Sequence, residues 1–108
     1  MRIGFFGTPE LARDVLKACV NIGYEIVYVV SQPDKPVGRK SDLVPSPVSQ
    51  FALDHEFTLY RPQLVRNNFE LLTNLESLEV DFIVVVAYGK ILPITILDLP
   101  KYLSINVH

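Results

Sequence analysis

Short apolar runs alternate along this chain with segments in which apolar residues recur every three or four positions. The runs are rich in β-branched and aromatic residues, and they predict strands over residues 2–6, 24–30, 57–60, 82–87 and 103–108. The periodic segments predict helices over residues 9–22, 47–56 and 69–78. Strands that alternate with helices build βαβ units. We therefore expect an α/β fold: a doubly wound, mostly parallel Rossmann-like sheet with helices on both faces.

A side chain suited to helix capping stands at the start of each predicted helix. These side chains are Thr8 for the first helix, Ser46 for the second, and Asn67 or Asn68 for the third. Gly23 follows the first helix and suits the left-handed conformation in which many helices end. Loops therefore connect each predicted strand to the helix that follows it. Ligands of doubly wound sheets bind at these loops, beyond the carboxyl ends of the strands.

Composition narrows the class of protein. A chain of 108 residues fits one domain, and its formal charge of −2 excludes a broadly basic nucleic-acid coat. No apolar stretch reaches the about 18 residues of a membrane helix, and the N-terminus does not fit a signal peptide. Cys19 is the only cysteine, and with only His55 and His108 beside it a zinc site is not expected. We therefore expect a cytoplasmic protein without a metal or a membrane partner.

The loop after the first predicted strand does not carry a dinucleotide fingerprint. Residues 4–9 lack the pattern G-x-G-x-x-G, whose glycines let the backbone approach the pyrophosphate. The second strand ends in Val30, Ser31 and Gln32, where an NAD site needs an acidic residue for the ribose. The predicted fold is therefore Rossmann-like without an NAD signature, and a nucleotide-binding module of unrelated function remains an alternative.

Residues 32–47 interrupt the alternation of strands and helices, and we expect a long loop there. The segment holds four prolines, one glycine and the cations Lys35, Arg39 and Lys40. Asp34 and Asp42 reduce its net charge to +1. Loops of this length inside compact domains are usually functional or disordered. The cations suit contact with phosphates, and a solvated surface loop is the simpler interpretation of the charges alone.

Asn106 and His108 stand at the end of the last predicted strand. Side chains alternate along a strand with a period of two, so both point to the same face. An amide donor beside an imidazole suits the stabilisation of an oxyanion and the transfer of a proton. On spacing alone, a histidine in solvent beside an asparagine that caps a turn is the simpler alternative.

Taken together, several motifs resemble the N-terminal part of the methionyl-tRNA formyltransferases. They are Phe-Gly-Thr-Pro-Glu at 6–10, Gln-Pro-Asp-Lys-Pro-Val-Gly-Arg at 32–39, Pro-Ser-Pro-Val at 45–48, Val-Val-Ala-Tyr-Gly-Lys-Ile-Leu-Pro at 85–93, and Ile-Asn-Val-His at 105–108. The resemblance covers essentially the whole chain, and the segment 32–48 is its most specific part. Other folate-dependent formyltransferases share the Asn-x-His pair but generally lack that segment.

The resemblance implies transfer of a formyl group from 10-formyltetrahydrofolate to the α-amine of methionyl-initiator-tRNA. It implies a Rossmann-like catalytic domain, a smaller C-terminal domain that helps to bind tRNA, and a monomeric full-length protein. By position it implies catalytic roles for Asn106 and His108, pterin-pocket roles for Tyr88, Gly89, Lys90, Ile91 and Leu92, and tRNA contacts for Lys35, Arg39 and Lys40.

Some parts of the family pattern are not present in residues 1–108. The third catalytic residue of the family, an aspartate, lies downstream, as does the C-terminal domain. Lys40-Ser41-Asp42 stands where the family usually has Gly-Lys-Lys. We therefore expect these residues to form the N-terminal portion of a catalytic domain, inactive by itself, whose last strand exposes apolar surface and favours self-association. The alternatives are a non-catalytic Rossmann-like module that binds folate or RNA, and another folate-dependent formyltransferase.

Overall fold

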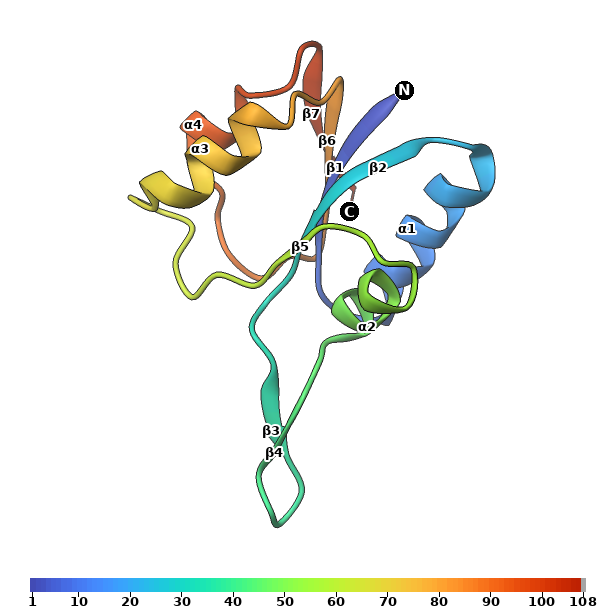
Figure 1. The fold of residues 1–108 in the computed structure, drawn as a ribbon, viewed down its shortest axis with the longest axis vertical. Helices are drawn as coiled ribbons and strands as arrows, with labels where there is room; N and C mark the ends of the chain where they lie inside the picture. The colour runs from blue at the N-terminus through green and yellow to red at the C-terminus, as the bar shows by residue number, and fades with distance from the viewer. Residues whose placement is uncertain (108) are drawn as a thin grey trace.

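The computed structural model describes residues 1–107 and shows a parallel sheet with helices on both faces (Figure 1). The sheet consists of β1 (Arg2–Gly7), β2 (Glu25–Val30), β5 (Leu59–Tyr60), β6 (Phe82–Val86) and β7 (Leu103–Val107). All four pairings are parallel, in the order β5-β2-β1-β6-β7. The chain therefore winds from β1 toward one edge and from β6 toward the other, which confirms the predicted doubly wound fold.

The helices divide between the two faces of the sheet. They are α1 (Glu10–Ile22), α2 (Pro47–Asp54), α3 (Phe69–Ser77) and α4 (Ile94–Leu97). Figure 1 shows α1 and α2 together on one face and α3 and α4 on the other. The short helix α4 was not predicted, because one helical turn is too short to produce a recognisable apolar period.

Successive side chains of the central strands point to opposite faces of the sheet, so a hydrophobic core forms on each face. Phe5 of β1 packs with the α1 and α2 side, whereas Phe6 packs with the α3 and α4 side. In β6, Val84 and Ile83 divide in the same way. The continuous apolar run of β6 follows from this arrangement, because a central parallel strand is buried on both faces.

Two predicted caps are confirmed and one is wrong. The hydroxyl of Ser46 accepts the amide of Ser49 at 3.1 Å, and the side chain of Asn68 accepts the amide of Leu71 at 3.1 Å. Thr8 does not cap α1: Pro9 takes the N-cap position, and within the described residues no side chain caps the helix. The hydroxyl of Thr8 instead donates to a carbonyl beyond β6, a contact that no local pattern encodes.

Residues 32–47 do not form the expected irregular loop but contain a β-hairpin. Its strands are β3 (Lys35–Val37) and β4 (Asp42–Val44), paired antiparallel. Gly38 has φ of 78°, Ser41 has φ of 53°, and the amide of Ser41 donates to the carbonyl of Gly38. The prolines obscured this hairpin, since they disfavour central strands yet are tolerated in a ribbon whose strands are both edges. In Figure 1 the hairpin projects away from the sheet.

β7 forms one edge of the sheet and carries the apolar exposure that was expected. Leu103, Ile105 and Val107 are 50%, 42% and 39% exposed. They pair with Phe82, Val84 and Val86, respectively, and so lie on the face of α1 and α2. Self-association through this surface stays a prediction.

We predict that Gly4→Ala destabilises the fold by about 3 kcal/mol, because a Cβ there would overlap the ring of the fully buried Tyr28. Urea denaturation measures the loss. Gly38→Ala is the matched control: a Cβ there meets no atom within 4 Å, and only its φ of 78° adds strain, about 1 kcal/mol. Equal losses in the two variants would contradict the packing argument.

Candidate active site

The loops that follow β1, β2 and β6 leave the sheet at the end where β7 terminates, because these strands are parallel. The winding direction reverses between β1 and β6. Doubly wound sheets bind their ligands outside the carboxyl ends of the strands at such a reversal. The candidate site is therefore expected near these three loops and the carboxyl end of β7.

A cavity of about 680 Å³ runs along the edge strand β7, bounded by the loop after β6 and by residues 97–102, which precede β7. Lys90, Ile91, Leu92 and Asn106 all contribute to its lining. The structure thus brings together four residues that the sequence placed in two separate motifs. Apolar walls with a few polar groups are typical of sites for small organic ligands, whose volumes run from about 300 to 1,000 Å³.

Asn106 contributes a polar amide to this cavity. It pairs with Val85, so its side chain points to the face of α3 and α4. Ser104 lies two residues earlier on the same face, and its hydroxyl donates to the carbonyl of Leu97 at 2.8 Å. The exposed amide of Asn106 can donate two N–H groups to a ligand oxygen. His108, the second predicted catalytic residue, lies outside the described residues.

The side chain of Tyr88 belongs to the core rather than to the cavity lining. Its ring is buried and packs edge-on against Phe6, with the centroids 5.3 Å apart. Its hydroxyl has no hydrogen-bond partner among residues 1–107, and burial raises the pKa of Tyr88 to about 12. Only the backbone of Tyr88 is therefore placed to act at the loop surface.

The loop around Tyr88 turns sharply on both sides. Ala87 has φ of 46° and Gly89 has φ of 101°, both in the left-handed region. Ala87 thereby ends β6 one residue earlier than the sequence predicted. A Cβ at Gly89 would also lie 3.0 Å from the side-chain nitrogen of Gln32, so glycine suits the position for space as well as for conformation.

Lys90 and Ile91 behave differently within the same loop. The ammonium of Lys90 donates to the carbonyls of Pro62 and Gln63, which ties this loop to the segment after β5. The side chain of Ile91 is 94% exposed at the cavity, whereas Leu92 is buried. The charge of Lys90 is thus engaged with backbone oxygens, and Ile91 offers apolar surface to a ligand.

The carbonyl of Tyr88 receives two side chains that were not recognised as site residues from the sequence. The hydroxyl of Thr8 donates to it at 2.7 Å, and the amide of Gln32 donates to it at 3.0 Å. Thr8 follows β1, one of the two strands between which the winding direction reverses. Gln32 follows β2, which pairs with β1. The sequence indicated only that Thr8 and Gln32 stand just after predicted strands. It did not indicate that both side chains bond the carbonyl of Tyr88.

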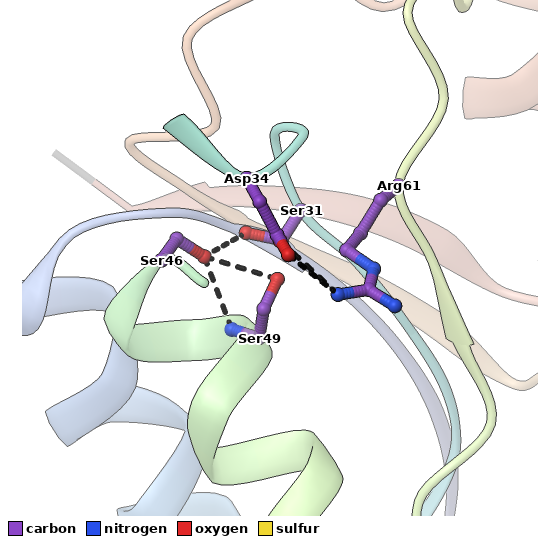
Figure 2. Close-up of polar contacts among 5 residues, drawn as sticks. All are labelled: Ser31, Asp34, Ser46, Ser49 and Arg61. Carbon is purple, nitrogen blue, oxygen red and sulfur yellow. Dashed lines mark hydrogen bonds and ion pairs between the residues drawn. The ribbon is translucent and has the colours of Figure 1, made fainter. Parts of the chain in front are cut away.

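Polar contacts clamp the base of the hairpin, as Figure 2 shows. The hydroxyls of Ser31 and Ser46 lie 2.6 Å apart and join the segments on either side of the hairpin. Ser46 also donates to the hydroxyl of Ser49 at 3.1 Å. Asp34 pairs with Arg61 at 3.1 Å. These contacts fix where the hairpin leaves the domain.

The three cations predicted to contact tRNA all lie on the exposed hairpin. Lys35 is in β3, and Arg39 and Lys40 lie in the turn. None of them lines the cavity beside Asn106. Since Asp34 is paired with Arg61, the ribbon and its turn carry three cations against the single carboxylate Asp42. The predicted site residues therefore form two separate groups, one at the cavity and one on the hairpin.

Neither a metal centre nor a membrane span is present within the part of the chain that the structure describes. No three His, Cys, Asp or Glu side chains of residues 1–107 gather around a common point. None of the described helices has the length and apolarity needed to cross a bilayer.

The order of the parallel strands, with helices on both faces, defines a Rossmann-like α/β domain, and a cavity lies along its edge strand β7. The chain belongs to the formyl transferase family, whose family model matches residues 1–108. A solved structure of glycinamide ribonucleotide transformylase 1 from Geobacillus kaustophilus has the same fold. It superposes with a TM-score of 0.69 at 16% identity, covering 99% of this chain and 57% of that one.

Two curated relatives are much more similar in sequence than this solved structure, and both are named methionyl-tRNA formyltransferase. The methionyl-tRNA formyltransferase of Sulfurihydrogenibium sp. (strain YO3AOP1) is 45% identical over 108 residues, and that of Pseudomonas entomophila (strain L48) is 49% identical over 108 residues. Each alignment covers 100% of this chain but only 35% and 34% of the relative, respectively. The chain thus spans about a third of the length of the relatives that it matches.

We predict that Tyr88 makes stability fall at alkaline pH. An unfolded tyrosine titrates near pH 10, below the pKa of about 12 that burial gives Tyr88. The unfolded state therefore loses its proton first, so the contribution of neutral Tyr88 is complete below about pH 10 and is lost as the pH rises toward 12. Tyr88→Phe should match the parent protein within about 1 kcal/mol at pH 7, because no group in the described part of the chain bonds the hydroxyl.

Urea denaturation between about pH 7 and pH 12 measures this difference. Tyr88→Phe should lose less stability than the parent above about pH 10. Tyr102→Phe is the control, because Tyr102 is exposed and its replacement should leave the pH profile unchanged. A parent-like alkaline decline in Tyr88→Phe would contradict the prediction.

Proposed function

We propose that this chain takes part in transfer of a formyl group from 10-formyltetrahydrofolate to the α-amine of methionyl-initiator-tRNA. The observation that carries the proposal is that Asn106, near the carboxyl end of β7, and residues 90–92, from the loop after β6, line one cavity. Membership of the formyl transferase family and the names of the curated relatives support the same reaction.

In this proposal Asn106 stabilises the negative charge that develops on the formyl oxygen. The amine nitrogen of the methionyl group forms a bond to the formyl carbon, and the carbonyl π electrons move to its oxygen. Collapse of this tetrahedral intermediate breaks the bond to N10, and tetrahydrofolate leaves after N10 gains the proton that the amine loses. An amide donor held by a strand beside the reacting carbonyl stabilises the oxyanion without rearrangement. His108 is proposed as the second catalytic residue, by its position in the family motif.

The loop of residues 88–92 is proposed to hold the pterin ring of the folate. A flat heteroaromatic ring suits a cavity with an apolar wall and a nearby loop with left-handed turns, since such turns expose backbone N–H and C=O groups. Ile91 supplies exposed apolar surface there. We assign Lys90 to holding the loop, because its ammonium already contacts two carbonyls.

The hairpin is proposed to contact the acceptor end of the tRNA. Lys35, Arg39 and Lys40 carry their charge on an exposed ribbon that projects from the domain (Figure 1). Attraction of cations to phosphates needs no base-specific contact, so three cations on a positioned ribbon suffice for a phosphate contact. Asp42, which stands in the segment where the family usually has cations, weakens this attraction.

Residues 1–108 are proposed as the N-terminal portion of the formyl-transferring catalytic domain of a cytoplasmic protein. The match to about a third of each curated relative supports this assignment. Formyl transfer is accordingly assigned to the complete gene product, and the experiments below use that product rather than residues 1–108 alone.

We predict that Asn106→Ala lowers the rate of formyl transfer by about 10² to 10³-fold, because one preorganised donor to the oxyanion is lost. Single-turnover transfer to methionyl-tRNA measures the rate. His108→Ala should also reduce the rate strongly, while both variants bind tRNA nearly as well as the parent protein. The control is Asn21→Ala, since Asn21 is exposed on α1. Full activity of Asn106→Ala would remove the assigned role.

We predict that Arg39→Ala and Lys40→Ala weaken tRNA binding through lost phosphate contacts. The slope of log affinity against log salt should become shallower by about one for each contact removed. Binding isotherms at several salt concentrations measure both effects. Lys17→Ala removes one exposed cation from α1, away from the hairpin, and should leave the slope unchanged. An unchanged slope in both hairpin variants would argue against this role of the hairpin.

A further inference from the structure

The carbonyl of Tyr88 joins three loops at the carboxyl end of the sheet. The Thr8 hydroxyl donates to it from the loop after β1, and the Gln32 amide donates to it from the segment after β2. A carbonyl oxygen has two lone pairs, and here each receives one donor. We call this group of contacts the Tyr88 junction. Because both lone pairs are occupied, the carbonyl does not also accept a hydrogen bond from a ligand.

The Tyr88 junction holds the hairpin from both of its ends. Gln32 lies in the short segment between β2 and β3, so its bond to Tyr88 tethers the chain just before the first strand of the hairpin. After the hairpin, the amide of Val48 in α2 donates to the backbone carbonyl of Thr8 at 3.2 Å. The hydroxyl of the same Thr8 donates to Tyr88. The segment before the hairpin thus reaches the Tyr88 oxygen directly through Gln32, and the segment after it reaches the same oxygen indirectly through Thr8.

That oxygen is also held from the side of the loop. The buried ring of Tyr88 anchors the residue against Phe6, and the left-handed turns at Ala87 and Gly89 orient its peptide group. Gly89 closely approaches Gln32, whose nitrogen would lie 3.0 Å from a Cβ at that position. A change in the conformation of residues 87–89 therefore cannot occur without moving Gln32 or breaking its bond.

We propose that the Tyr88 junction couples the loop of residues 88–92 to the hairpin, with Thr8 and Gln32 as positioning residues. This inference rests on the proposed function, in which a reduced folate occupies the loop and tRNA contacts the hairpin. A ligand that holds the loop in its bound conformation keeps the Tyr88 carbonyl aimed at Thr8 and Gln32. The hairpin is then already ordered for the second ligand, so each ligand strengthens the binding of the other by the same factor.

Two isosteric substitutions test the coupling. Thr8→Val and Gln32→Met each remove one donor to the Tyr88 carbonyl with little change in side-chain volume. The affinity for deacylated initiator tRNA is measured on the complete gene product, without and with saturating 5-formyltetrahydrofolate. In the parent protein the folate should raise tRNA affinity at least about fivefold. In each variant this factor should fall to within about twofold of unity, since one hydrogen bond of the junction is lost.

Matched controls distinguish coupling from a general loss of stability. Gln50→Met and Thr73→Val make the same chemical changes at exposed positions on α2 and α3, and both should retain the parent coupling factor. If both ligands bind the parent protein without affecting each other, the inference is overturned while the proposed function stands. If coupling persists in Thr8→Val and Gln32→Met, the inference is again overturned. If neither ligand binds, the proposed function fails and the inference fails with it.

Amide hydrogen exchange provides a readout that does not depend on tRNA. Addition of 5-formyltetrahydrofolate to the parent protein should slow exchange in residues 87–92 and also in the hairpin, residues 35–44. In Gln32→Met the folate should still protect residues 87–92 but no longer the hairpin. Protection confined to residues 87–92 in the parent protein would overturn the inference, because the junction would then transmit nothing to the hairpin.

Discussion

The structure depends on the parallel pairing of β1 with β2 along one side and with β6 along the other. The pairing places Gly4 beneath the ring of Tyr28, and it sends Phe5 and Phe6 to opposite faces of the sheet. Each face thereby gains a core on which its helices pack. Because the strands are parallel, the loops after β1, β2 and β6 gather at the end of the sheet where β7 terminates, and the winding reverses there between β1 and β6.

Two regions with different chemistry arise at that end. The cavity beside β7 combines apolar surface with the amide of Asn106, whereas the hairpin carries cations on an exposed ribbon. The first suits a small organic ligand, and the second suits phosphates. The carbonyl of Tyr88 lies structurally between them, since it receives Gln32 from the foot of the hairpin and belongs to the loop that forms part of the cavity.

Much of the candidate site could be predicted from the sequence. The prediction was more complete for the cavity residues than for the hairpin and Thr8. The proximity of Asn106 to residues 90–92 follows from parallel strands whose loops leave at one end, and the structure shows them lining one cavity. The hairpin was predicted as a functional segment but not as a ribbon, because its pairing depends on the turn at Gly38 and Ser41 rather than on an apolar period. Thr8 was assigned to a helix cap because its bond to Tyr88 spans 80 residues of sequence.

The sequence by itself determined the alternation of strands and helices, the parallel sheet and two helix caps, because these depend on contacts between near neighbours and on the burial of each strand face. Only the tertiary structure decided which side chains meet. Residues that lie apart in the chain form the bond from Thr8 to Tyr88 and the hydrogen bond between Ser31 and Ser46. Such residues also bury the ring of Tyr88. A polar side chain has many potential partners, and only the packing of the complete sheet selects the one within hydrogen-bonding distance.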